Sequence, residues 1–214
     1  IIKDGSTQWM TAGGGILHIE TPPEQLVISG GLFHGLQLWV NLPAAQKMVS
    51  PAYQNLDADQ VKLFTTPDAG TLVRLIAGDI AGIQGPGSTR TPIVMAHATI
   101  LPGSQMVLPW NPAFNALAHV VKGSGFVGID RHAFSVGQTA VFGTGDSITL
   151  AASPHEALDV ILLGGQPIGE PVEQYGPFVM NTRAELQQAM DDYQRGRLGT
   201  VPSGGVQPYR GPRK

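Results

Sequence analysis

Glycine and proline interrupt this chain so often that a fold built on long helices is excluded. The 214 residues include 28 glycines and 17 prolines, and both residue types weaken helix interiors. Many of them stand between short apolar runs, for example at residues 13–15, 85–87 and 123–125, where they allow the chain to reverse. The glycines follow no Gly-X-Y period of the collagen type. The sequence therefore predicts a turn-rich, mostly β protein.

The composition excludes several other classes of protein. A hydrophobic fraction of 42% argues against wholesale disorder. The chain has no cysteine, so any metal must be held by His, Asp or Glu side chains. A net charge of −3 argues against a general nucleic-acid binder. Because no apolar run approaches a membrane span and no signal peptide opens the chain, we expect a cytoplasmic protein without a membrane partner.

Strand-like runs alternate with turn signals over the first 165 residues. The expected strands are residues 7–11, 16–20, 36–42, 71–76, 93–101, 116–121, 126–129, 139–142 and 158–163. Many short strands at this spacing are typical of a sandwich or barrel. The tryptophans at positions 9, 39 and 110 lie in strand-like surroundings. We expect core packing for them, with the lining of a ligand pocket as the alternative.

One helix is well signalled, near the C-terminus. Thr182 and Glu185 form a capping-box pair, and Gly196 provides a stop. Between them an apolar stripe of helical spacing contains Leu186, Met190 and Tyr193. Beyond the helix, residues 197–214 are rich in Gly and Pro and are predicted to be disordered. The three basic residues of this tail, Arg210, Arg213 and Lys214, are too few to favour a nucleic-acid arm.

An internal repeat organises the chain. Residues 5–13 align without a gap with residues 137–145, and residues 36–40 resemble residues 158–162 at a shorter offset. The two halves are therefore predicted to be copies of one β unit. The second copy is preceded by the strands and turns of residues 93–129, and the first copy has no such segment before it in this chain.

His18 and Glu20 are the strongest candidates for chemistry. The repeat places them opposite Leu150 and Ala152, so one copy carries a polar pair where the other is apolar. Residues i and i+2 of a strand point to the same face. An imidazole and a carboxylate on one face are half of a metal site, although a hydrogen-bonded structural pair is an equally valid interpretation.

The other histidines give weaker signals. His34 opens an expected strand, where a structural hydrogen-bonded role is favoured over a role in a pocket. The remaining histidines have no His or carboxylate at i±2 and are predicted to be core or surface residues, namely His97, His119, His132 and His155. The chain also has no nucleophile elbow, Walker loop or dinucleotide fingerprint.

Three motifs carry a family resemblance. They are QWMTAG with GILHIE at residues 8–20, HGLQLWVNLP at residues 34–43, and QYGPFVMNT at residues 174–182. Together they resemble the pirin family of the cupin superfamily over nearly the whole chain. The resemblance implies an all-β fold of two cupin-type antiparallel β-barrels (double-stranded β-helices, a bicupin) with a C-terminal helix.

The same resemblance implies a domain plan with an incomplete first barrel. Residues 1–58 are the remainder of an N-terminal metal-site barrel, and residues 59–168 are a C-terminal barrel without metal ligands. Residues 169–196 are a segment and helix that pack back on the N-terminal barrel, and residues 197–214 are the tail.

In pirins a single divalent metal, most often iron, is held by three His and one Glu. By position His18 and Glu20 are the third and fourth ligands, and the first two belong to an upstream His-x-His that this N-terminally truncated chain lacks. Fe(II) is the expected cofactor, and other divalent ions are compatible with the ligands. We therefore expect the chain as numbered to be metal-poor and its unpaired edge to invite association.

The resemblance implies two alternative functions. The first is a quercetin 2,3-dioxygenase-type oxidoreductase that uses a mononuclear divalent metal and O2 on a flavonol-like substrate, with Glu20 as catalytic base, impaired in the truncated chain. The second is an iron-dependent redox-sensing regulator that binds transcription factors or enzymes without turnover. Neither alternative includes direct binding to nucleic acid.

Overall fold

The chain divides into two compact units. A computed structural model of the chain describes residues 4–18, 20 and 22–199. The larger unit contains residues 4–9 and 54–168, and the smaller unit contains residues 10–53 together with the described residues from 169 onward. Among the described residues, no helix combines the length and hydrophobicity that crossing a membrane requires.

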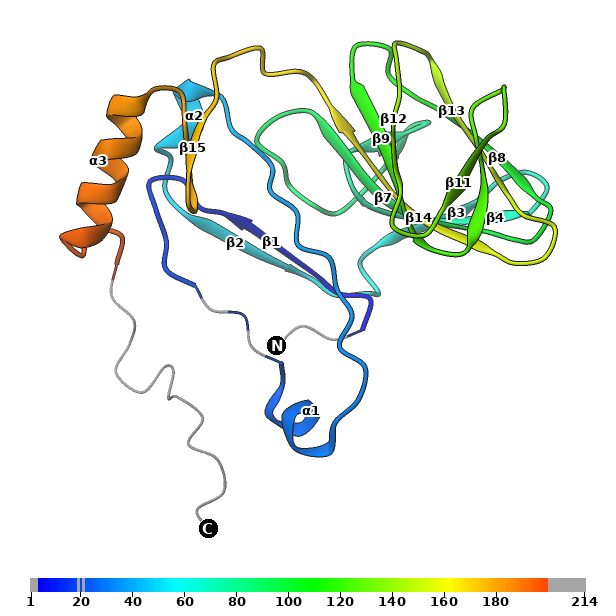
Figure 1. Cartoon of the computed structure of the whole chain (residues 1–214), viewed down its shortest axis with the longest axis horizontal. Coiled ribbons are helices and arrows are strands. Elements are labelled where there is room, and N and C mark those ends of the chain that lie inside the picture. The colour runs from blue at the N-terminus through cyan, green and yellow to red at the C-terminus, as the bar shows by residue number, and fades with distance from the viewer. Residues whose placement is uncertain (1–3, 19, 21, 200–214) are drawn as a thin grey trace. The chain divides into compact units, whose positions relative to one another are not determined.

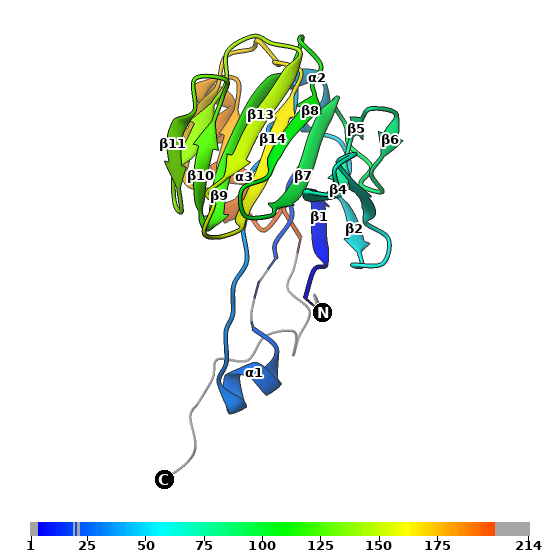
Figure 2. The same cartoon turned by 90° about the vertical axis from the view of Figure 1, so that its right-hand side faces the viewer.

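Two antiparallel sheets form the larger unit. The six-stranded sheet has the order β12-β9-β14-β7-β4-β3, with the bounds Thr139–Val141, Asn115–Lys122, Leu158–Gly165, Ile93–Ile100, Thr71–Ala77 and Lys62–Thr65. The four-stranded sheet has the order β11-β10-β13-β8, with the bounds His132–Ser135, Ser124–Val127, Ser147–Ala152 and Gln105–Pro109. Figure 2 shows the two sheets as facing layers. A short hairpin follows β4 and consists of β5 (Asp79–Ile80) and β6 (Ile83–Gln84).

The core lies between these layers because apolar residues alternate along the strands. Every second residue of β7 is buried, from Val94 to Ile100, and β9 repeats the pattern. The facing strands contribute larger side chains, which include Met106, Leu108, Ile148 and Leu150. Alternation with a period of two buries one face of each sheet. The predicted all-β class with antiparallel sheets is thus confirmed.

Two predicted strands of the first repeat copy are wrong for this structure. The described residues 16–18 and 20 form no strand, and neither do residues 36–42. Their counterparts in the second copy are β13 and β14, and each of these pairs with a neighbour on both sides. A strand needs partners for its backbone N–H and C=O groups, and no described strand pairs with either segment of the first copy. Trp39, expected in the core, is 60% exposed for the same reason.

The smaller unit combines short helices with a hairpin (Figure 1). Its elements are α1 (Glu24–Ser29), α2 (Ala44–Lys47), β15 (Glu173–Tyr175), β16 (Phe178–Met180) and α3 (Arg183–Gln194). The chain passes between the units along β1 (Thr7–Thr11) and β2 (Ala52–Leu56), which form a two-stranded sheet. The predicted disordered tail and its three basic residues lie, from residue 200 on, outside the described residues.

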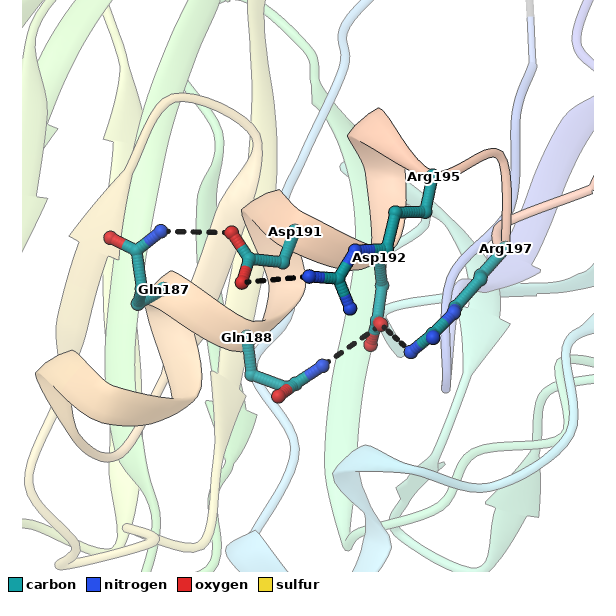
Figure 3. A network of polar contacts seen from close by, with 6 residues as sticks. All are labelled: Gln187, Gln188, Asp191, Asp192, Arg195 and Arg197. Carbon is teal, nitrogen blue, oxygen red and sulfur yellow. Dashed lines mark hydrogen bonds and ion pairs between the residues drawn. The ribbon is translucent and has the colours of Figure 1, made fainter.

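The predicted C-terminal helix is present, and its cap is the predicted one. The Thr182 side chain accepts a hydrogen bond from the Glu185 backbone N–H at 3.2 Å, and Glu185 Oε2 accepts one from the Asn181 N–H at 3.1 Å. Polar side chains on the exposed surface of α3 pair at i,i+4 spacing, as Figure 3 shows for Gln187 with Asp191 and Gln188 with Asp192. Each such pair stabilises a helix by about 0.2–0.5 kcal/mol. The pairs therefore support α3 as a helix but do not determine where it packs.

A buried lysine joins the two chain segments of the smaller unit. Lys47 is 6% exposed, and its Nζ donates to Asn41 Oδ1 at 2.6 Å and to the Val179 carbonyl at 3.2 Å. Glu170 Oε2 accepts hydrogen bonds from the Ala44 N–H at 2.6 Å and from Asn181 Nδ2 at 2.9 Å. Burial lowers the pKa of Lys47, against the opposing attraction of nearby Glu170 and Glu185. Residues 41–47 and 170–181 are therefore held together by polar contacts.

We predict that Lys47→Met destabilises the smaller unit by about 1–3 kcal/mol, the cost of leaving buried hydrogen-bond acceptors without a donor. Amide hydrogen exchange of residues 173–180 should accelerate, because the Val179 carbonyl loses its partner. Lys62→Met, on an exposed position of β3, is the matched control and should leave that exchange rate unchanged. Equal exchange in both variants would show that Lys47 does not hold the hairpin.

A polar cluster interrupts the outward face of the six-stranded sheet. His97 Nε2 lies 3.2 Å from Asp159 Oδ1, which also accepts a hydrogen bond from Thr99 Oγ1 at 2.6 Å. Arg74 Nη1 donates to Thr99 Oγ1 at 3.0 Å. Burial, followed by the neighbouring Arg74 guanidinium, lowers the pKa of His97, and Asp159 opposes that shift only in part.

The lowered pKa of His97 makes the larger unit less stable in acid. As the pH falls, His97 of the unfolded chain takes up a proton near its ordinary pKa of 6.5, whereas His97 of the folded protein does so only at a lower pH. The free energy of unfolding therefore decreases as the pH drops below that value. We predict that the free energy of unfolding of the unmodified chain decreases by up to about 1.4 kcal/mol more per pH unit than that of the His97→Gln variant. Chemical denaturation of both proteins between about pH 5 and pH 8 measures it. Parallel pH profiles would refute the assignment.

Candidate functional site

The structure brings His18 and Glu20 side by side. His18 Nδ1 lies 3.9 Å from Glu20 Oε1, and the two side chains are 43% and 48% exposed. This proximity of the two side chains does not come from a strand, because the described residues around them form none. The predicted adjacency is therefore present although its predicted cause is not.

A glycine turn fixes the start of this segment. The Gly14 N–H donates to the Val49 carbonyl at 2.9 Å, and a Cβ on Gly13 would lie 2.0 Å from the same oxygen. Gly13 also has a φ of +53°, a region that L side chains rarely adopt. Residues 12–15 can therefore pack closely against residues 48–50 only because glycine occupies position 13.

Gln37 is a member of the site that the sequence reasoning missed. Its Nε2 donates to Glu20 Oε2 at 3.0 Å, so it holds the carboxylate oxygen that does not face His18. The separation of 17 residues hides this contact from any local pattern. The signal that pointed to it was its place in the HGLQLWVNLP motif. An amide donor that fixes a carboxylate is the usual support for a metal-ligating or proton-accepting group.

The other histidines separate into two kinds. His34 is exposed and makes no hydrogen bond or ion pair among the described residues, so its expected hydrogen-bonded role finds no support there. His97 and His119 have cross-strand partners, Asp159 and Thr139 respectively, that a search at i±2 could not find. None of these side chains joins His18 and Glu20 in a larger set of ligands, because the described residues contain no group of three or more His, Cys, Asp or Glu side chains that could hold a metal.

The donor types at His18 and Glu20 suit a divalent metal, but their number does not complete a site. Imidazole nitrogen and carboxylate oxygen are both common ligands of transition metals. Two protein ligands leave most coordination positions to water. The described residues thus place two donors of the metal-ligating types side by side, and Gln37 is hydrogen-bonded to one of them.

The second repeat copy has no polar pair at the equivalent place. Leu150 and Ala152 are 0% and 2% exposed and belong to the core between the two sheets. Their apolar packing fills the space that a metal site would need. The two copies therefore differ in structure as they do in sequence. The first copy has a solvent-exposed polar pair at this place, and the second has buried core residues.

Known proteins match this chain at both ends. The family described as "Pirin" matches residues 1–40, which include His18 and Glu20, and the family described as "Pirin C-terminal cupin domain" matches residues 95–199. Pirin-1 of Arabidopsis thaliana is 40% identical over 201 residues, and the match covers 92% of this chain and 67% of that protein. Human Pirin is 36% identical over 200 residues, with the same two coverages.

A solved structure agrees with the sequence matches. A crystal structure titled quercetin 2,3-dioxygenase from Acinetobacter baumannii superposes with a TM-score of 0.88 at 36% identity, over 94% of this chain and 69% of that one. This chain thus spans about two thirds of the length of these relatives. The predicted cupin fold class is confirmed, and the chain belongs to the pirin family.

Proposed function

We propose that this protein is a metal-dependent oxidoreductase of the quercetin 2,3-dioxygenase type. The observation that carries the proposal is the adjacency of His18 and Glu20, within the segment that matches the Pirin family. The neighbouring structure titled quercetin 2,3-dioxygenase supports the reaction class. A flavonol-like small aromatic molecule is the proposed substrate, and Fe(II) the proposed metal.

Each residue of the pair has a separate task in this proposal. His18 and Glu20 would be two ligands of the metal, which when bound supplies a site for O2 and for the deprotonated substrate. Glu20 is also the proposed base that accepts the proton of the flavonol hydroxyl. The Glu20 side chain is exposed enough for a substrate to approach it. Gln37 keeps one carboxylate oxygen fixed through its 3.0 Å hydrogen bond, so that the other oxygen stays directed to His18.

Metal binding is the first test, because two side chains make a weak site. We predict that the purified 214-residue chain, loaded with Fe(II) without oxygen and then dialysed, retains well under one equivalent of iron. His18→Ala and Glu20→Ala should remove most of what remains, as measured by elemental analysis. Near-stoichiometric iron in the unmodified chain would contradict a half-site, and iron retained in both variants would place the metal elsewhere.

Flavonol turnover is the second test. With excess Fe(II) and O2, the chain should open quercetin slowly and release carbon monoxide, which gas analysis detects. We predict a loss of at least about 100-fold in His18→Ala and Glu20→Ala, and of about tenfold in Gln37→Ala, since supporting residues typically contribute 10- to 100-fold. His34→Ala, at an exposed position of the same unit, is the matched control. Turnover that survives in the first two variants would refute these roles.

One observation favours a regulator that binds a protein partner as the second candidate function. Residues 32–40 are exposed throughout and include Leu32 at 88% and Phe33 at 67% exposure. Exposed apolar segments of this kind often mark interaction surfaces. Iron-dependent capture of a protein partner, with no flavonol turnover at any iron concentration, would favour this alternative over the enzyme.

A further inference from the structure

The residues that follow α3 return to the glycine turn that precedes the His18–Glu20 pair. Leu198 and Gly15 belong to the same unit. A Cβ on Gly15 would lie 2.3 Å from Leu198 Cδ2, 3.1 Å from its Cγ and 3.2 Å from its Cδ1. The Leu198 side chain therefore occupies the space beside the α-carbon of Gly15, and this contact joins the C-terminal segment to the segment that carries the candidate site.

Glycine at position 15 is what admits this contact. Gly15 has a φ of +121°, a region that L side chains rarely adopt. Its N–H donates to the Ala12 carbonyl at 3.0 Å and so closes the turn of residues 12–15. Any larger residue at this position would displace Leu198 as well as strain the backbone.

The turn is thus held from two directions. The Val49 carbonyl accepts the Gly14 N–H at 2.9 Å, which fixes the backbone of the turn by a hydrogen bond. Leu198, which is half-buried, covers Gly15 with an apolar side chain. Removal of apolar surface from water stabilises such a contact. The position of the turn therefore depends on the C-terminal segment as well as on residues 48–50.

The end of α3 directs Leu198 to this place. Gly196, with a φ of +69°, turns the chain out of the helix, and its N–H donates to the Tyr193 carbonyl at 3.0 Å. The Arg197 N–H donates to the Asp192 carbonyl at 2.9 Å, and Arg197 Nη1 donates to Asp192 Oδ1 at 2.9 Å, the pair drawn in Figure 3. Leu198 is therefore presented by a helix end that main-chain and side-chain hydrogen bonds hold in place.

The turn is the last fixed point of the backbone before His18. Residues 16 and 17 make no hydrogen bond to another described residue, and the described residues 16–18 form no strand. The direction in which the chain leaves the turn therefore determines where His18 lies. Glu20 has a separate support, the hydrogen bond from Gln37. Metal ligands have to be held in a fixed geometry by the residues around them.

We propose that Leu198 is a positioning residue of the His18–Glu20 pair. By filling the space beside Gly15 it keeps the turn against Val49, and the turn directs His18 towards Glu20. One apolar contact thereby couples the C-terminal end of α3 to the candidate metal ligands. The inference rests on the proposed function for the role of the metal, whereas the contact and its effect on the turn can be measured without it.

The test measures Mn(II) binding and amide hydrogen exchange in the complete 214-residue chain. Leu198→Ala should accelerate exchange of the Gly14 and Gly15 amides about tenfold, because the turn opens more often. It should also weaken Mn(II) binding about three- to tenfold, as measured by electron paramagnetic resonance of the free ion, because the pair then has to be ordered on binding. Leu198→Met, which fills a similar volume, should restore both values. Leu63→Ala, at an exposed leucine of the larger unit, is the matched control and should change neither.

A double-mutant cycle tests the contact itself. Gly15→Ala should weaken Mn(II) binding more in the unmodified chain than in the Leu198→Ala chain, because the added Cβ then no longer meets the leucine side chain. Backbone strain from the positive φ acts in both chains and cancels in the comparison. Equal losses in the two chains would overturn the proposal.

His18→Ala and Glu20→Ala separate a failure of this proposal from a failure of the proposed function. If neither variant changes Mn(II) binding, the proposed function is contradicted, and the exchange of the Gly14 and Gly15 amides in Leu198→Ala decides the positioning role by itself. Unchanged exchange, or Mn(II) binding that depends on His18 but not on Leu198, would overturn that role. Dispersed amide signals of each variant establish that it has folded.

Discussion

Backbone pairing on both sides of a strand is the constraint on which this structure depends. The central strand β14 pairs with β7 along its whole length and with β9 on its other edge. This double pairing satisfies the backbone in the middle of the sheet and presents alternate residues to the core. In the first repeat copy, residues 36–42 have a similar apolar sequence but pair with no described strand; they form no regular structure, and residues 36–40 are exposed. The same kind of sequence thus gives a buried strand or an exposed segment according to whether partners are beside it.

The contrast also explains why the two copies differ in chemistry. In the larger unit the interior is closed by packed apolar residues, and Leu150 and Ala152 fill the place of the polar pair. In the smaller unit His18 and Glu20 are about half exposed and are held by a glycine turn and by Gln37. A metal ligand has to combine fixed geometry with access. Of the two copies, only the first has a fixed and accessible polar pair at this place.

The smaller unit shows how segments distant in sequence are held by polar contacts where apolar burial is limited. Lys47 joins residues 41–47 to residues 170–181, and burial of its ammonium carries a desolvation cost that nearby Glu170 and Glu185 offset in part. Leu186 is the one buried residue of α3. Hydrogen-bond geometry, more than buried area, therefore specifies how the C-terminal segment lies on this unit.

The sequence by itself determined the all-β class and the C-terminal helix with its Thr182–Glu185 cap, because turn residues and helix caps act over a few residues. It also indicated the His18–Glu20 pair, although the strand that was expected to bring the two side chains together did not form. It also identified the family through its motifs. It could not reveal Gln37 beside Glu20 or Asp159 beside His97, because those contacts join residues 17 and 62 positions apart. It predicted strands at residues 16–20 and 36–42 that did not form. Alternating apolar residues make a segment able to form a strand, but only neighbouring strands in the tertiary structure can satisfy its backbone.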